Sequence, residues 1–262
     1  MRNIRLTLAY DGTNFHGWQR QPNAPTIQAC VENAIERVTG LQSTVWASGR
    51  TDAGVHAAAQ VCNFITECPI PCSNLVKALN DVLPASIRVN ASSEVAAAFH
   101  ARYNARAKVY RYRILQAPVC SPFLWRFVYH YPYALDCTAM AKAARLIEGK
   151  HDFTSFAAVG EEQEARRQKS EARIGRAQAQ GMVREIFTSR VLSRTKNSML
   201  IYDVRGSGFL HHMVRNIVGT LMEVGRGKIE PDEIRRILKA RDRTLAGPTA
   251  PALGLCLMRV EY

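Results

Sequence analysis

The sequence lacks a long apolar run, because Arg, Glu or Gly interrupts each of its longest hydrophobic stretches. A membrane-spanning helix needs about 20 predominantly apolar residues in succession. The first residues, "MRNIRLTLAYDG", enter strand-like alternation directly and contain no apolar signal core or cleavage site. These absences predict a cytoplasmic protein that does not bind a membrane.

The cysteines are too few and too irregularly placed to form a disulfide framework. There are seven in 262 residues, an odd number, and we expect reduced thiols. Cys68 and Cys72 resemble half of a zinc site, but no second ligand pair stands at the usual spacing. His211 and His212 are adjacent rather than four apart, so they cannot share a helix face as a helical zinc pair does. Because the sequence also lacks a dinucleotide fingerprint and a phosphate-binding loop, we expect neither a metal nor an organic cofactor.

Acidic residues are scarce relative to basic ones. The chain has 22 Asp and Glu against 35 Lys and Arg, which gives a formal net charge of +13 and an isoelectric point near 9.7. Such an excess favours a polyanionic partner, and nucleic acid is the first candidate.

Hydrophobic periodicity predicts strands and helices in two similar sets. In the first, a strand at 2–10 ends at Asp11-Gly12, a helix at 27–38 is closed by Gly40, and a helix runs from Ser73, its cap, to Leu83. In the second, a strand at 108–115 is followed by a helix around 140–147, two strands, a long helix over 210–224, a shorter helix from Pro231 and a final strand at 254–262.

We therefore predict an α+β fold with two similar α/β lobes, residues 1–104 and 105–262. A largely antiparallel central sheet should carry helices on its faces, and a basic active-site cleft should lie between the lobes. The segment 160–175 has dense mixed charge and no apolar period, which predicts an exposed, solvated loop. Contact of this loop with RNA is the alternative.

The stretch "SGRTDAGVHA", residues 48–57, surrounds the carboxylate of Asp52 with small residues. Gly49 and Gly54 allow a sharp bend or the close approach of another molecule. Asp and Gly are also the commonest turn formers. The stretch by itself is therefore either a plain turn or a loop that admits a ligand to one carboxylate.

Six motifs together resemble those of the tRNA pseudouridine synthase A family, in order and in approximate spacing. They are "YDGTNFHGWQRQ" (10–21), "GRTDAGVHA" (49–57), "FHARYNARAKVYRYRI" (99–114), "HDFTSF" (151–156), "GFLHHMVRNIVGTLMEVGRGK" (208–228) and "AGPTAPALGLCL" (246–257). The resemblance extends essentially from end to end and is weakest at 160–172. It implies isomerisation of uridine to pseudouridine at positions 38, 39 and 40 of the tRNA anticodon stem-loop, and a homodimer.

The chemistry of this reaction is consistent with the sequence. The C1′–N1 bond breaks, the base turns, and a C1′–C5 bond forms without redox change, so no cofactor is needed. A carboxylate can trap or stabilise the positive charge that develops on the sugar, or remove the C2′ proton. Asp52 matches the family's catalytic aspartate, in the lobe 1–104. Attack at C1′, addition to the base and C2′ proton removal stay open.

The resemblance assigns three residues of the lobe 105–262 to the same site. Arg215 matches the arginine that pairs with the aspartate, and its simpler interpretation is a solvent-facing helix residue. Tyr110 matches the active-site tyrosine, which would stack on a flipped-out uridine and take the C5 proton. Tyr110 and Tyr112 share a strand face, and core packing is the simpler interpretation of both. Leu255 matches the apolar residue that packs against uracil, or is a core leucine.

Basic residues near these motifs are candidates for contacts with phosphates. Arg50 would hold a tRNA phosphate or brace the Asp52 loop, and Arg102 and Arg106 would contact the RNA backbone. Neighbouring cations are assigned to the same role: Lys108, Arg111 and Arg113.

Four residues near the motifs have less specific assignments. Phe15, Trp18 and Gln19 would wedge into the anticodon arm or pack their loop. His56, with no acidic neighbour in sequence, is interpreted as a hydrogen-bonded structural histidine.

Two other functional classes share some of these features. A non-catalytic tRNA-binding module would explain the charge and the aromatic residues, but not a small-residue loop that presents one carboxylate. A metal-dependent nuclease needs several converging carboxylates, and only Asp11, Asp52 and Asp152 lie near the motifs.

Overall fold

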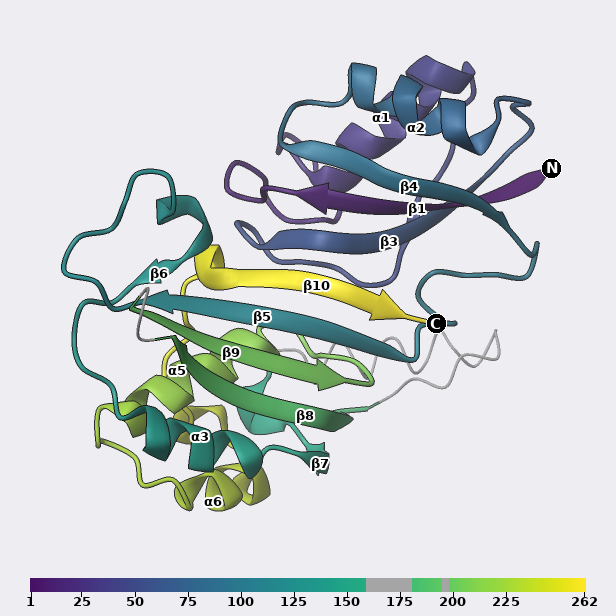
Figure 1. Ribbon diagram of the computed structural model, residues 1–262. Helices are drawn as coiled ribbons and strands as arrows, with labels where there is room; N and C mark the ends of the chain where they lie inside the picture. Colours follow the sequence, from purple (N-terminus) through teal and green to yellow (C-terminus); the bar gives the residue numbers. More distant parts are fainter. Residues whose placement is uncertain (159–180, 195–197) are drawn as a thin grey trace. The chain divides into compact units, whose positions relative to one another are not determined.

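A computed structural model describes residues 1–158, 181–194 and 198–262 (Figure 1). The charged segment predicted at 160–175 lies outside these residues. The chain divides into two compact units, Met1–Arg106 with Cys256–Tyr262, and Ala107–Leu255. The boundary was predicted after residue 104, and the division falls after Arg106. The last strand, expected in the second lobe, belongs to the first unit.

The first unit is built on a sheet with the strand order β4-β1-β3-β10, and β2 pairs with Cys62 and Asn63 of β3. The strands are β1 (Arg2–Tyr10), β2 (Trp46–Ala47), β3 (His56–Thr66), β4 (Ile87–Val95) and β10 (Leu255–Glu261). β1 runs antiparallel to β3 and β4, while β10 joins β3 in parallel, with Cys256 opposite His56. Ile4, Leu6 and Leu8 are fully buried, which confirms the predicted alternation.

Two helices accompany this sheet, α1 (Ile27–Thr39) and α2 (Cys72–Val82). α1 ends, as predicted, at Gly40, whose φ of 73° is the left-handed conformation that closes many helices. The predicted cap of α2 is wrong. Pro71 occupies the N-cap position and makes no side-chain capping bond, which leaves Ser73 inside the first turn.

The second unit has a sheet with the order β5-β9-β8-β7, antiparallel throughout, and β6 adds to β5 in parallel. Its strands are β5 (Ala107–Leu115), β6 (Tyr129–His130), β7 (Gly149–Asp152), β8 (Val183–Arg194) and β9 (Met199–Gly206). Its α-helices are α3 (Cys137–Arg145), α5 (Met213–Gly225) and α6 (Glu233–Ala240). Short 3-10 turns lie at Trp125–Phe127, Thr154–Phe156, Arg243–Leu245 and Ala252–Gly254.

The helices of the second unit pack as the periodicity predicts, but their starts differ. α3 packs against β8 and α5. α5 begins at Met213 rather than at Leu210, because His212 adopts the left-handed conformation with φ 59°. α6 begins at Glu233, two residues after Pro231.

The predicted α+β class, with a largely antiparallel sheet, is confirmed. None of the helices in residues 1–158, 181–194 and 198–262 combines the length and the apolar character that a membrane span requires. All seven cysteines are free thiols.

Candidate functional site

Asp52 lies in the connection that leads from β2 to β3. The Val55 N–H donates to the Asp52 carbonyl at 3.1 Å, and Gly54 has φ 77°, so the segment is a tight turn that needs glycine at this position. The Asp52 side chain is half-buried, and Thr51 beside it is buried. The backbone of this stretch is therefore a turn, which was one of the two interpretations of the sequence. The turn presents one carboxylate.

The first motif packs directly against this turn. The Trp18 N–H donates to the Thr51 carbonyl at 3.0 Å, and the Gly54 N–H donates to the Phe15 carbonyl at 3.2 Å. Phe15 and Trp18 are 9% and 2% exposed. The packing alternative is thus the observed one for both rings, and the wedge into an RNA arm is wrong for them.

Two glycines allow the two loops to approach at backbone distance. A Cβ atom on Gly12 would lie 2.0 Å from the Val55 carbonyl oxygen. Gly17 has φ 85°, and its Cβ would lie 2.7 Å from the Thr51 carbonyl oxygen. The glycines of the first motif therefore serve the Asp52 turn.

A buried polar network supports the turn from the sheet. The hydroxyls of Tyr10 and Thr51 lie 2.9 Å apart, and the Gln60 amide donates to the Gly49 carbonyl at 2.9 Å. The Ser48 hydroxyl donates to the Gln60 side-chain oxygen at 2.7 Å. Burial raises the pKa of Tyr10 well above its ordinary value, so its phenol stays protonated.

Tyr10 and Gln60 support the site although sequence patterns did not predict this role. A signal was present, because the alternation in β1 places Tyr10 on the core face, where a tyrosine hydroxyl needs a partner.

His56 has the structural role that was predicted for it. It is 4% exposed, and its Nδ1 lies 3.1 Å from the Gly12 N–H and 3.3 Å from the Asp11 carboxylate. The acidic neighbour comes from the end of β1 rather than from nearby sequence. Asp11 is itself held by the amide and the hydroxyl of Thr13.

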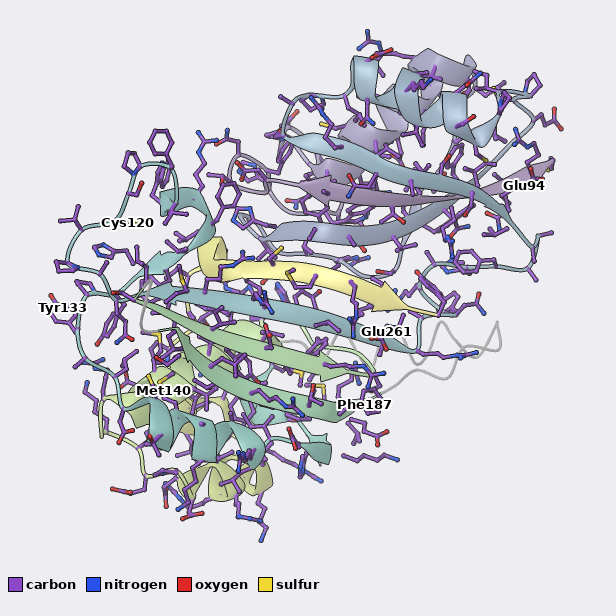
Figure 2. The ribbon with its side chains drawn as sticks, viewed as in Figure 1. Glu94, Cys120, Tyr133, Met140, Phe187 and Glu261 are labelled. Carbon is purple, nitrogen blue, oxygen red and sulfur yellow. The ribbon has the colours of Figure 1, made fainter. Side chains whose placement is uncertain are left out.

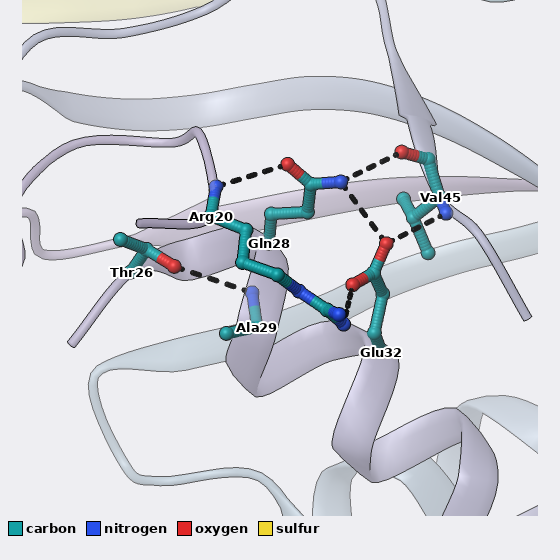
Figure 3. A network of polar contacts seen from close by, with 6 residues as sticks. All are labelled: Arg20, Thr26, Gln28, Ala29, Glu32 and Val45. Carbon is teal, nitrogen blue, oxygen red and sulfur yellow. Dashed lines mark hydrogen bonds and ion pairs between the residues drawn. The ribbon is translucent and has the colours of Figure 1, made fainter. Parts of the chain in front are cut away.

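A second network ties the end of the first motif to α1 (Figure 3). The buried Glu32 carboxylate accepts hydrogen bonds from the Gln28 amide and the Val45 N–H, both at 3.0 Å, and pairs with Arg20. The Arg20 N–H donates to the Gln28 side-chain oxygen at 3.1 Å. Because Val45 precedes β2, this network also fixes the strand from which the Asp52 turn starts.

Tyr110 lies in β5 of the second unit, on its buried face. It is 7% exposed, and its ring meets Phe209 edge to face at a centroid distance of 5.1 Å. Tyr112 is fully buried and donates its hydroxyl to the Pro251 carbonyl at 2.7 Å. Burial raises the pKa of Tyr112. The core interpretation is confirmed for Tyr112.

Arg215 is half-buried on α5, within a region where the last two motifs meet. Its Nε donates to the Ala250 carbonyl at 2.8 Å, and the Ala250 N–H donates to the Arg215 carbonyl at 3.1 Å. A Cβ on Gly219 would lie 1.6 Å from the Pro248 carbonyl oxygen, so the helix and residues 246–251 are in close contact. The solvent-facing interpretation of Arg215 is wrong. Leu255, the first residue of β10, is 5% exposed.

Asn216 helps to fix this segment, a role that no sequence pattern predicted. Its side-chain oxygen accepts hydrogen bonds from the Thr249 hydroxyl at 2.7 Å and from Arg243 at 3.0 Å.

The basic residues differ in how they are engaged. Arg111 makes a two-point ion pair with Asp203 on the neighbouring strand, with both contacts at 2.7 Å. We therefore withdraw its assignment to phosphate. The side chains of Arg50, Arg102 and Arg106 are exposed in the first unit.

The predicted site residues are thus divided between the two units. The first unit contains Arg50, Asp52, Arg102 and Arg106. The second contains Tyr110, Arg215 and Leu255.

Comparison with known proteins gives one consistent result. The profile of the tRNA pseudouridine synthase family matches residues 7–104 and 143–262. A protein of Solibacter usitatus named tRNA pseudouridine synthase A is 52% identical over 262 residues and is covered completely, as is this chain. Proteins of the same name from Moorella thermoacetica and Syntrophotalea carbinolica are 47% and 44% identical. They cover 99% and 100% of this chain, which covers 99% and 97% of them.

Proposed function

Because this chain belongs to the tRNA pseudouridine synthase family, we propose that it modifies uridines 38, 39 and 40 of the anticodon stem-loop. The coarser activity, isomerisation of uridine in tRNA, follows from membership of the family. The choice of these positions rests on the resemblance of the six motifs, and the observation that supports the catalytic assignment is the turn of residues 51–55, which presents Asp52 from a tightly held loop.

Asp52 is proposed as the catalytic carboxylate, acting on the ribose of a flipped-out uridine. Cleavage of the C1′–N1 bond leaves positive charge at C1′, which a nearby carboxylate stabilises or traps. Bonds from Trp18 and Gly54 hold the turn, and its half-burial limits the water around the carboxylate. A fixed carboxylate needs little reorganisation when charge develops on the sugar.

The second unit supplies the other proposed catalytic groups. Arg215 is proposed as the cation that keeps Asp52 ionised, which fits its half-buried guanidinium anchored on Ala250. Tyr110 is proposed to stack on the uridine and to take the C5 proton after the base has turned. Leu255 is proposed as the apolar contact to the uracil.

Phosphate contacts are assigned to exposed arginines of the first unit. Arg50 lies two residues from Asp52, and Arg102 and Arg106 follow β4. Contacts of this kind position an RNA without reading its sequence.

The reaction as proposed needs no metal or cofactor, because it transfers no group and changes no oxidation state. Activity should therefore be the same in the presence of a chelator. A metal-dependent nuclease would lose activity and would cut the tRNA.

We also propose a cytoplasmic homodimer. Residues 116–135, which follow β5, expose large apolar side chains and include no acidic residue. Val119 is 80% exposed, Phe123 90%, Trp125 49% and Tyr133 67%, and Tyr133 is labelled in Figure 2. Apolar groups gathered at a surface are typical of protein–protein contacts. Light scattering should give a dimer for the parent and a monomer for Phe123→Asp. A monomeric parent would contradict the proposal.

The decisive experiment for the catalytic assignment is Asp52→Asn. This change keeps the size and turn-forming capacity of the side chain and removes the charge. The assay uses tRNA whose uridines carry tritium at C5, because formation of the C1′–C5 bond releases that label. The variant should fold and bind tRNA but release no tritium. Asp81→Asn, an exposed position in α2, is the control and should behave as the parent. Tritium release by a folded Asp52→Asn variant would end the assignment, and a variant with parental activity would show that Asp52 is only a turn former.

A further inference from the structure

Three aromatic rings form a row on the first unit, which we call the aromatic row: Trp46, His100 and Tyr103. The Trp46 and His100 rings are 6.1 Å apart between centroids, and His100 and Tyr103 are 4.4 Å apart with an angle of 35° between their planes. Trp46 is 37% exposed and Tyr103 65% exposed. The row therefore offers aromatic surface to solvent at both of its ends.

Hydrogen bonds hold the row in place. The His100 N–H donates to the Asn104 side chain at 2.7 Å, and the Arg102 N–H donates to the His100 Nδ1 at 3.1 Å. The Ala101 N–H donates to the Asn63 side chain at 2.9 Å, and Asn63 is the partner of Trp46 in the β2–β3 register. The two chain segments that carry the rings are thus tied to the same residue of β3.

The central ring is suited to stacking rather than to charge. Partial burial, together with the positive charge of Arg102, lowers the pKa of His100 below its ordinary value. The ring is therefore neutral near pH 7, which agrees with its Nδ1 accepting a hydrogen bond. Because the row carries no charge, it does not repel the guanidinium of Arg102. This residue is exposed and lies in the same turn as Tyr103.

An unpaired nucleotide of RNA matches this combination. Each base has a flat face that stacks on Trp or Tyr whatever its sequence, and its phosphate pairs with a neighbouring guanidinium. The net charge of +13 favours this polyanion over an acidic peptide with its smaller charge density. The row lies in the same unit as the Asp52 turn, and Trp46 is six residues before Asp52, so the two residues are at most about 22 Å apart along an extended chain.

We propose that Trp46 and Tyr103 each stack on an unpaired tRNA base, neither of them the reacting uridine, and that Arg102 pairs with the phosphate of the base on Tyr103. This second contact rests on tRNA being the substrate. It lets the enzyme bind the RNA outside the active site in a way that does not depend on the RNA sequence. Such binding suits an enzyme that acts on several neighbouring uridines, since it does not specify any one of them.

The test measures binding of an unmodified tRNA transcript over a series of salt concentrations. Trp46→Ala and Tyr103→Ala should each weaken binding about tenfold at every salt concentration, because stacking releases no counterions. Arg102→Gln should instead reduce the slope of log affinity against log salt by about 1. Tyr103→Phe keeps the ring and should bind as the parent does. Ile65→Ala, 42% exposed on β3, is the matched control and should have no effect.

Fluorescence provides an independent readout. A base stacked on Trp46 should quench its emission, and Trp46→Phe should remove that part of the change seen on titration with tRNA. Parental affinity in Trp46→Ala and Tyr103→Ala, with tritium release intact, would overturn the aromatic row as a contact and leave the proposed function standing. Loss of binding in Tyr103→Phe would also overturn it, because the hydroxyl and not the ring would then be responsible. A parent that does not bind tRNA would instead overturn the proposed function and this inference with it.

Discussion

Substitution of Gly12 by alanine should separate the geometry of the Asp52 turn from the stability of the fold. A Cβ at this position would lie 2.0 Å from the Val55 carbonyl oxygen, and real Cβ contacts are not shorter than 3.0 Å. The two backbones must therefore separate by about 1 Å (3.0 − 2.0 Å). Asp52 precedes Val55 by three residues in the same turn, so the carboxylate moves with it.

The size of the effect follows from this displacement. A misplacement of about 1 Å costs a catalytic site on the order of a hundredfold in rate. Overpacking of this kind also lowers the free energy of unfolding by about 1–3 kcal/mol. We therefore expect Gly12→Ala to remain folded, to bind tRNA nearly as the parent does, and to lose about a hundredfold in kcat/KM for tritium release.

Gly40→Ala provides a control matched in stability. Gly40 closes α1 with φ 73°, and no atom lies within 4 Å of the position of its Cβ. An alanine forced into the left-handed conformation costs about 1–2 kcal/mol, without contact with the turn. Both variants should therefore lose similar stability in urea unfolding, and only Gly12→Ala should lose activity. Equal kcat/KM in the two variants would refute the conclusion that the first motif positions the turn that carries Asp52.

Three further predictions concern the Tyr110 hydroxyl, the net charge of the chain and the buried Glu32 network. Tyr110→Phe keeps the edge-to-face contact with Phe209 and should bind tRNA normally, yet turnover should fall about 10²- to 10⁴-fold; normal turnover would leave Tyr110 only a packing role. The affinity for tRNA should fall more than tenfold between about 50 and about 200 mM salt, because bound phosphates release counterions; a flat dependence would show that the charge of the chain does not act in binding. Glu32→Ala should lower the free energy of unfolding by about 3 kcal/mol, since two buried donors lose their acceptor. Arg20→Ala should cost less than about 1 kcal/mol, because its side chain is 58% exposed, and equal losses in urea unfolding would contradict this.

The sequence is sufficient to predict most elements because their patterns are local. The alternation in β1 places Ile4, Leu6 and Leu8 in the core, and Gly40 ends α1, since both depend only on the period of side chains along one element. Element ends are predicted less well. α2 begins at Cys72 without a serine cap, and α5 begins three residues later than its apolar stripe, where His212 turns left-handed. Capping geometry depends on the direction from which the chain enters the helix, which periodicity does not contain.

Side-chain partners from distant elements lie beyond the reach of sequence patterns. The charge of Arg111 looked available for phosphate, but register places Asp203 opposite it on β9. Arg215 would be a surface residue by default, but residues 246–251 fold back and accept its hydrogen bond.

Composition, periodicity and six ordered motifs are enough to predict the class of fold, the basic character and the family. The basic character is a sum over the chain. The class of fold and the family follow from the order of residues along it. The folded structure packs Phe15 and Trp18 against the Asp52 turn. It also brought Trp46, His100 and Tyr103 into one row, from segments about 50 residues apart. Both results depend on which backbones meet at van der Waals distance. That is settled only when strands pair and loops close, because the free energy of such contacts belongs to pairs of distant residues and not to any stretch of sequence.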